Sequence, residues 1–154
     1  MNNNDILKRL RYTFKLNDAA TMHLFAEGGL TTNREQVCSW LKNEDEEDFK
    51  PLYDIDLSAF LNGFIIAKRG KKEDITPKPE KSLNNNIIIR KLKIALNLKD
   101  EDILEILALT KFLFGKHELS ALFRNHTQTQ YRVCKDQVLR NFLMGLQLKY
   151  HPEK

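Results

Sequence analysis

Five acidic residues stand side by side in the first half of the chain and form its densest cluster of charge: Glu44, Asp45, Glu46, Glu47 and Asp48. Carboxylates this close together attract a divalent cation or the basic surface of a protein partner. The run lacks the alternating acidic pattern and the glycine of a calcium-binding loop, so calcium is not the expected ligand. A solvated loop between two helices is the alternative interpretation.

Aromatic residues flank this acidic run. Trp40 precedes it, and Phe49 and Tyr53 follow it. Trp and Tyr beside charged residues are typical of protein-binding patches, although the same residue types also fill the core and rim of ordinary domains. We therefore group Trp40 with the acidic run as the candidate partner-binding residues.

Basic residues form the second candidate site. Lys8, Arg11 and Lys15 fall at positions i, i+3 and i+7 of one expected helix, and Arg90 and Lys93 repeat most of this pattern later in the chain. A basic stripe of this kind can follow the phosphate backbone of a nucleic acid. The net charge is only +4, so an ordinary charged helix face and contact with an acidic protein remain open as alternatives.

The residue types that carry most enzyme chemistry show no catalytic spacing. The four histidines and two cysteines form no metal-ligand pattern, and the sequence has neither a phosphate-binding glycine loop nor a G-x-S-x-G motif. We expect no catalytic residue, no cofactor and no bound metal. A binding protein is therefore favoured over an enzyme.

The chain contains an internal duplication. Sliding the sequence along itself by 82 positions aligns residues 2–72 with residues 84–154 without a gap, and 15 of the 71 pairs are identical. DIDLSAFLNGF, which starts at Asp54, aligns with DQVLRNFLMGL, which starts at Asp136. The acidic run aligns with the neutral sequence HTQTQ at residues 126–130. A function specific to one repeat is therefore expected at the acidic run.

Apolar residues in each copy recur at helical spacing, as in the series Ile6, Leu7, Leu10 and Phe14. No stretch alternates as a strand does. The predicted fold is all-α, with two tandem pseudo-symmetric four-helix repeats and about eight helices. We expect repeat 1 at residues 1–72, a proline-containing, solvent-exposed linker at 73–83, and repeat 2 at 84–154.

Polar residues mark the expected helix ends. Asp18 and Asp100 are placed to cap the second helix of each copy, and Thr32 with Glu35 has the form of a capping box for the third. Asn43 is placed to end the third helix in the left-handed conformation.

Two glycines occupy the interior of the fourth helices. Gly63 and its counterpart Gly145 cost about 1 kcal/mol each relative to alanine in a helix. We therefore expect another helix to approach closely at these positions.

Composition favours a soluble folded protein, since 42% of residues are hydrophobic and 30% are charged. No apolar run reaches the roughly 20 residues that span a membrane, and the first residues, MNNNDILKRLRY, lack the pattern of an export signal. Only two cysteines, Cys38 and Cys134, are present, as is usual in a reducing compartment. We expect a cytoplasmic location.

The sequence also resembles the YehS-like family of small, uncharacterised bacterial proteins, which are built from a duplicated domain of unknown function. The matching stretches are NDILKRLRY, WLKNEDEEDF, LSAFLNGFI, NNNIIIRKLKIAL and DQVLRNFLMGL, and the resemblance covers nearly the whole chain. It implies a bacterial, cytoplasmic, all-helical protein, and it supplies no activity or site residue.

These observations favour a non-enzymatic helical interaction or adaptor module that binds another macromolecule, most simply a protein. The binding surface is expected at the acidic run or in grooves between the two halves. The alternative is a nucleic-acid-binding protein that uses the repeated basic first helices.

Overall fold

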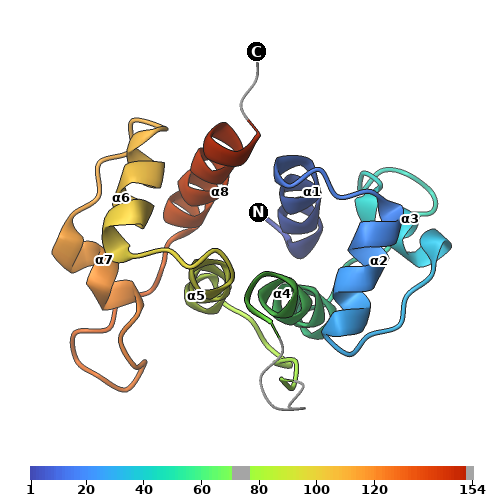
Figure 1. Ribbon diagram of the computed structural model, residues 1–154, viewed down its shortest axis with the longest axis horizontal. Helices are drawn as coiled ribbons and strands as arrows, with labels where there is room; N and C mark the ends of the chain where they lie inside the picture. The colour runs from blue at the N-terminus through green and yellow to red at the C-terminus, as the bar shows by residue number, and fades with distance from the viewer. Residues whose placement is uncertain (71–76, 152–154) are drawn as a thin grey trace. The chain divides into compact units, whose positions relative to one another are not determined.

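The computed structural model describes residues 1–70 and 77–151, and in this part of the chain it contains eight α-helices and no strand (Figure 1). The all-α prediction is confirmed. The chain divides into two compact units, Met1–Leu83 and Asn84–Lys154. The first holds α1 (Asn3–Thr13), α2 (Asp18–Glu27), α3 (Arg34–Leu41) and α4 (Asp54–Arg69). The second holds α5 (Asn85–Ala95), α6 (Asp100–Ala108), α7 (Lys116–Leu122) and α8 (Asp136–Tyr150).

An aromatic cluster fills the core of the first unit. The Phe25 ring lies 5.0 Å from the Trp40 ring and 5.1 Å from the Phe60 ring, centroid to centroid. Phe25 and Phe60 are fully buried, and α1 adds Leu7 and Leu10 from its apolar stripe. Tilted aromatic pairs at this spacing stabilise a core beyond the area that they bury. The helical apolar spacing therefore predicted the buried positions Ile6, Leu7 and Leu10 correctly, whereas Phe14 is half-buried just past the end of α1.

The glycines inside the fourth helices mark close helix crossings, as the sequence predicted. A Cβ atom on Gly63 would overlap the carbonyl oxygen of Leu24 in α2, and one on Gly28 would overlap the carbonyl oxygen of Ala59 in α4. In the second unit, a Cβ on Gly145 would overlap Ile106 of α6. The backbones of α2 and α4, and of α6 and α8, therefore approach each other without an intervening side chain.

The expected caps at Asp18 and Asp100 are wrong. Asn17 is the cap of α2, because its side chain accepts a hydrogen bond from the Ala20 N–H. Asp18 is the first residue of the helix, and its carboxylate lies 2.9 Å from the Arg11 guanidinium. Asp100 likewise lies 2.7 Å from the Lys93 ammonium. The shared aspartates therefore tie the second helix of each unit to the first.

The expected ends of the third helix are also wrong. Asn33, and not Thr32, caps α3, since its side chain accepts from the Gln36 N–H. The left-handed conformation does not occur at Asn43; it occurs at Lys15 and the equivalent Asn97, with φ of 53° and 54°. These two residues end the first helix of each unit, and Asn43 instead begins a turn.

Three consecutive asparagines anchor the start of each repeat. Asn2 caps α1 by accepting from the Asp5 N–H. Asn3 donates 2.7 Å to the Asp54 carboxylate. Asn4 is 3% exposed and bonds both sides of the segment between α3 and α4. The asparagines at 84, 85 and 86 make equivalent bonds in the second unit.

The later part of the expected linker packs on the first unit. The Ser58 hydroxyl, fully buried in α4, donates 2.5 Å to the Glu80 carboxylate, and the Leu83 N–H donates to Asp54. Glu80 and Leu83 are half-buried, in contrast to the expected solvent exposure. Residues 73–76 of the expected linker lie outside the described residues.

Candidate functional site

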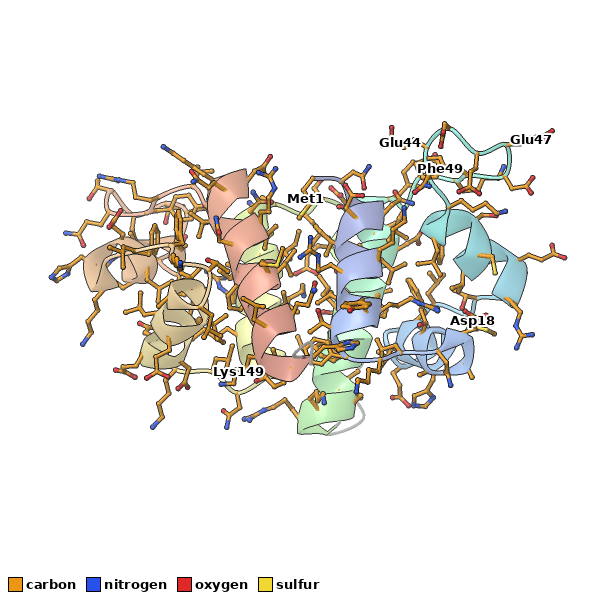
Figure 2. The ribbon with its side chains drawn as sticks, turned by 90° about the horizontal axis from the view of Figure 1, so that it is seen from above. Met1, Asp18, Glu44, Glu47, Phe49 and Lys149 are labelled. Carbon is orange, nitrogen blue, oxygen red and sulfur yellow. The ribbon has the colours of Figure 1, made fainter. Side chains whose placement is uncertain are left out.

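The acidic loop, Glu44–Asp48, lies between α3 and α4, and all five of its side chains are exposed. Figure 2 shows Glu44 and Glu47 on this loop, with Phe49 at its end. The Glu46 N–H donates to the Asn43 carbonyl, and the Phe49 N–H donates to the Glu46 carbonyl. The backbone of the loop is therefore held by its own turns. All five carboxylates remain exposed, although Glu44 accepts from the Asn2 side chain and Glu46 from the Asn43 N–H.

The neutral loop of the second unit has the same backbone pattern. There the Gln128 N–H donates to the Asn125 carbonyl, and the Tyr131 N–H donates to the Gln128 carbonyl. Glu46 accepts from the Asn43 N–H at 3.1 Å, and Gln128 accepts from the Asn125 N–H at 3.0 Å. The neutral amide of Gln128 thus makes the same turn-supporting bond as the Glu46 carboxylate. The loop does not need its negative charge in order to fold.

Few groups offset the charge of the acidic loop. Lys42 lies 3.9 Å from the Glu46 carboxylate and 3.8 Å from the Asp48 carboxylate, and Asp48 is 74% exposed. Exposed pairs of this kind contribute little to stability. Within residues 1–70 and 77–151, no group of three or more His, Cys, Asp or Glu side chains is arranged to hold a metal ion. The Asn2 amide also donates 2.8 Å to the Glu44 carboxylate, but it carries no charge. Lys42 is thus the one cation paired with the loop among the described residues, and most of the negative charge is left for a partner.

Trp40 belongs to the core, which revises its expected role as a partner contact. Its side chain is 3% exposed, and its carbonyl accepts a buried hydrogen bond from Asn4. Tyr53 is the exposed aromatic residue near the acidic loop, at 66% exposure. Tyr53 therefore offers far more accessible surface than Trp40 does.

A surface groove of about 420 Å³ adjoins the acidic loop in the first unit. We call it the first groove. Its lining includes Glu35 from α3, Tyr53 before α4, and Asp56 from the first turn of α4. Lys50 is the one basic residue of the lining. Burial raises the pKa of the Asp56 carboxyl, because a partly desolvated carboxylate is harder to ionise.

The predicted basic stripe is partly engaged within the fold. Arg11 pairs with Asp18, and Lys93 pairs with Asp100 while its ammonium lies 4.3 Å from the centre of the Phe123 ring. Arg90 donates to the carbonyl of Phe123. Lys8 donates to Asn43 at 3.5 Å, and Lys15 is exposed. The fold therefore uses two of these five cations as links between helices.

The two cysteines differ in exposure and predicted reactivity. Cys38 is exposed, whereas Cys134 is 1% exposed, and burial followed by the charge of Asp136 raises the pKa of the Cys134 thiol to about 11. Because the thiolate is the reactive form, we expect a colorimetric disulfide reagent to modify Cys38 quickly at mildly alkaline pH and to spare Cys134. Both thiols should react after unfolding. Fast reaction of both cysteines in the native protein would contradict this placement.

These features define a class of protein that is all-helical and is made of two equivalent four-helix units. The surface loop between the third and fourth helices is charged in the first unit and neutral in the second. No helix in the described part of the chain is long and apolar enough to cross a membrane.

A family model described as a protein of unknown function (DUF1456) matches residues 3–70 and again residues 85–151. The chain belongs to this family, which confirms both the expected YehS-like family and the duplication. It is 43% identical, over all of its length and 99% of the relative's, to "Uncharacterized protein YehS" of Escherichia coli (strain K12). No solved structure matches the chain.

Proposed function

We propose that this protein is a non-enzymatic interaction module of the bacterial cytoplasm that binds a basic segment of a protein partner through the acidic loop and the first groove. The observation that carries the proposal is that the loop holds five exposed carboxylates although its neutral counterpart folds in the same way. Because the loop can fold without these negative charges, the charges are available to bind a partner. The unpaired cysteines support a reducing compartment.

The loop and the groove are neighbours along the chain, and both carry carboxyl groups. Lys50, two residues after the loop, lines the groove, and its N–H donates to the Ser39 carbonyl of α3. Glu35 and Asp56 add carboxylates to the groove lining. An acidic surface steers a basic segment toward it, and an exposed tyrosine at its edge, here Tyr53, supplies the kind of anchor that concentrates binding energy.

The nucleic-acid alternative has weaker support. Arg11 and Lys93 would have to contact phosphates while paired with Asp18 and Asp100. Lys8, Lys15 and Arg90 remain as its candidate contacts, and Arg90 already donates to a backbone carbonyl.

Exchanging the acidic loop for its neutral counterpart tests the proposal. In the variant, residues 44–48 carry the sequence HTQTQ of residues 126–130, which has the same turn pattern. The probe is a fluorescein-labelled peptide of alternating lysine and alanine, and the measurement is fluorescence anisotropy at low and high ionic strength. We expect the exchange to weaken binding by about tenfold, because the steering charge is lost.

A matched control separates a specific surface from general charge. Glu101→Gln combined with Glu105→Gln removes exposed carboxylates from α6, and this variant should bind the basic peptide as the natural chain does. Equal affinity of the loop-exchange variant and the natural chain would contradict the proposal. Salt-sensitive binding of duplex DNA that Lys8→Ala with Arg90→Ala abolishes would favour the nucleic-acid alternative.

A further inference from the structure

The second unit carries a groove at the position equivalent to the first groove. This second groove has a volume of about 410 Å³. Six lining positions of the two grooves correspond at the repeat offset of 82: Gln36 with Glu118, Trp40 with Leu122, Lys50 with Arg132, Pro51 with Val133, Tyr53 with Lys135 and Asp56 with Val138. The shared backbone of the repeat therefore produces a groove in each unit, and the side chains decide what each can bind.

The lining of the second groove is mainly apolar. Phe112, Leu113 and Phe114 contribute to it, whereas the equivalent residues 30–32 of the first unit read LTT. Leu113 is 90% exposed and Val133 is 69% exposed. Lys111 just before them has a φ of 61°, a conformation that the equivalent Gly29 adopts without a side-chain penalty. Leu113 is thus exposed to solvent just after a turn in which Lys111 adopts an unfavourable left-handed conformation.

The charges that line the second groove are opposite to those of the first. Glu35 and Asp56 correspond to His117 and Val138, so two carboxyl groups are lost. Arg132 and Lys135 line the second groove, and the Arg132 guanidinium donates to two backbone carbonyls, those of Thr129 and Tyr131. The one carboxylate in the lining, Glu118, accepts from the Gly115 N–H at the start of α7. The charge left for a partner in this groove is positive.

We propose that the second groove binds an extended protein segment in which bulky apolar side chains are flanked by carboxylates. Leu113 and Val133 provide the apolar contact, because burying exposed aliphatic surface is the main favourable term in such docking. Arg132 and Lys135 recognise the flanking carboxylates. This site is separate from the acidic loop and the first groove, so the chain offers two docking surfaces of opposite charge, and either can fail experimentally without the other.

The test uses a fluorescein-labelled peptide with a Leu-Phe-Leu centre flanked by Asp and Glu, measured by fluorescence anisotropy on the full chain. One comparison peptide keeps the centre and has lysine flanks, and another keeps the acidic flanks and has a serine centre. We expect the acidic apolar peptide alone to bind. Equal binding of the lysine-flanked peptide, or no binding of the acidic apolar peptide, would overturn the proposal.

Protein variants locate the binding to this groove. Leu113→Ser and Lys135→Glu should each weaken binding by about tenfold, as expected for contacts central to an interface. Leu109→Ser is the matched control, since Leu109 is also an exposed leucine, at 50%, but does not line the groove. Unchanged affinity in both groove variants would overturn the proposal. Sedimentation that shows self-association lost in Leu113→Ser would do so too, because a second copy would then be the occupant.

Discussion

Gly63→Ala is expected to lower the free energy of unfolding by about 3 kcal/mol or more, despite a gain of about 1 kcal/mol in helix propensity. The new methyl group would overlap the carbonyl oxygen of Leu24. That oxygen accepts from the Gly28 N–H at the end of α2, so it cannot move alone. The overlap is relieved only if α2 shifts away from α4, which opens the core around Phe25.

Urea unfolding followed by tryptophan fluorescence measures this effect. Trp40 is the single tryptophan of the chain, and it packs against Phe25 in the first unit. Gly115→Ala is the control, because its methyl group would meet only the carboxylate end of the flexible Glu118 side chain. Since Gly115 lies in the second unit, circular dichroism follows that variant, and we expect a change below about 1 kcal/mol. A fully stable Gly63→Ala protein would show that α2 and α4 do not cross as closely as the structure has them.

The helices and most of their buried positions were predictable, whereas several of their capping residues were not. Apolar spacing identifies a helix because the core selects one face, as at Ile6, Leu7 and Leu10. A cap depends on which of several neighbouring polar residues turns its side chain back to the backbone. Asn17 and Asp18 are both suitable caps by type. Asn17 caps the helix, and the Asp18 carboxylate pairs with Arg11 instead.

Polar residues that are identical in the two repeats also form hydrogen bonds between distant segments of each unit. Asp54 and Asp136 begin the fourth helix of each unit, and they also accept from Asn3 and Asn85 across the unit. These bonds join residues about fifty positions apart, and no local pattern reveals them. The one sequence feature that pointed to them is the asparagine triplet, which occurs at residues 2–4 and again at 84–86.

The candidate site was predictable only in part. The acidic loop was visible as a charge run, and its neutral counterpart showed that the charge is not shared by the repeats. The first groove was missed because its lining comes from α3, α4 and the segment between them. The second groove left one signal, the apolar FLF at residues 112–114 opposite LTT at residues 30–32.

Asn4→Ala and Asn86→Ala are each expected to lower the free energy of unfolding by about 4 kcal/mol, because each leaves three backbone groups without a partner at about 1–3 kcal/mol per buried group. The Asn4 amide donates 2.9 Å to the carbonyls of Trp40 and Lys50, and its oxygen accepts from the Leu52 N–H at 3.0 Å. The Asn86 amide makes the same three bonds, to the residues 82 positions further on.

The asparagine variants also test why the triplet occurs twice. Asn2→Ala removes an exposed helix cap and an exposed bond to the Glu44 carboxylate, with no buried group left unpaired, and should cost about 1 kcal/mol, so it is the matched control for Asn4→Ala. Unfolding is followed by tryptophan fluorescence for these two variants and by circular dichroism for Asn86→Ala. If Asn4→Ala costs no more than Asn2→Ala, the buried bonds do not hold the α3–α4 segment in place. A large cost in both repeats would show that the same buried amide positions the acidic loop in one unit and its neutral counterpart in the other.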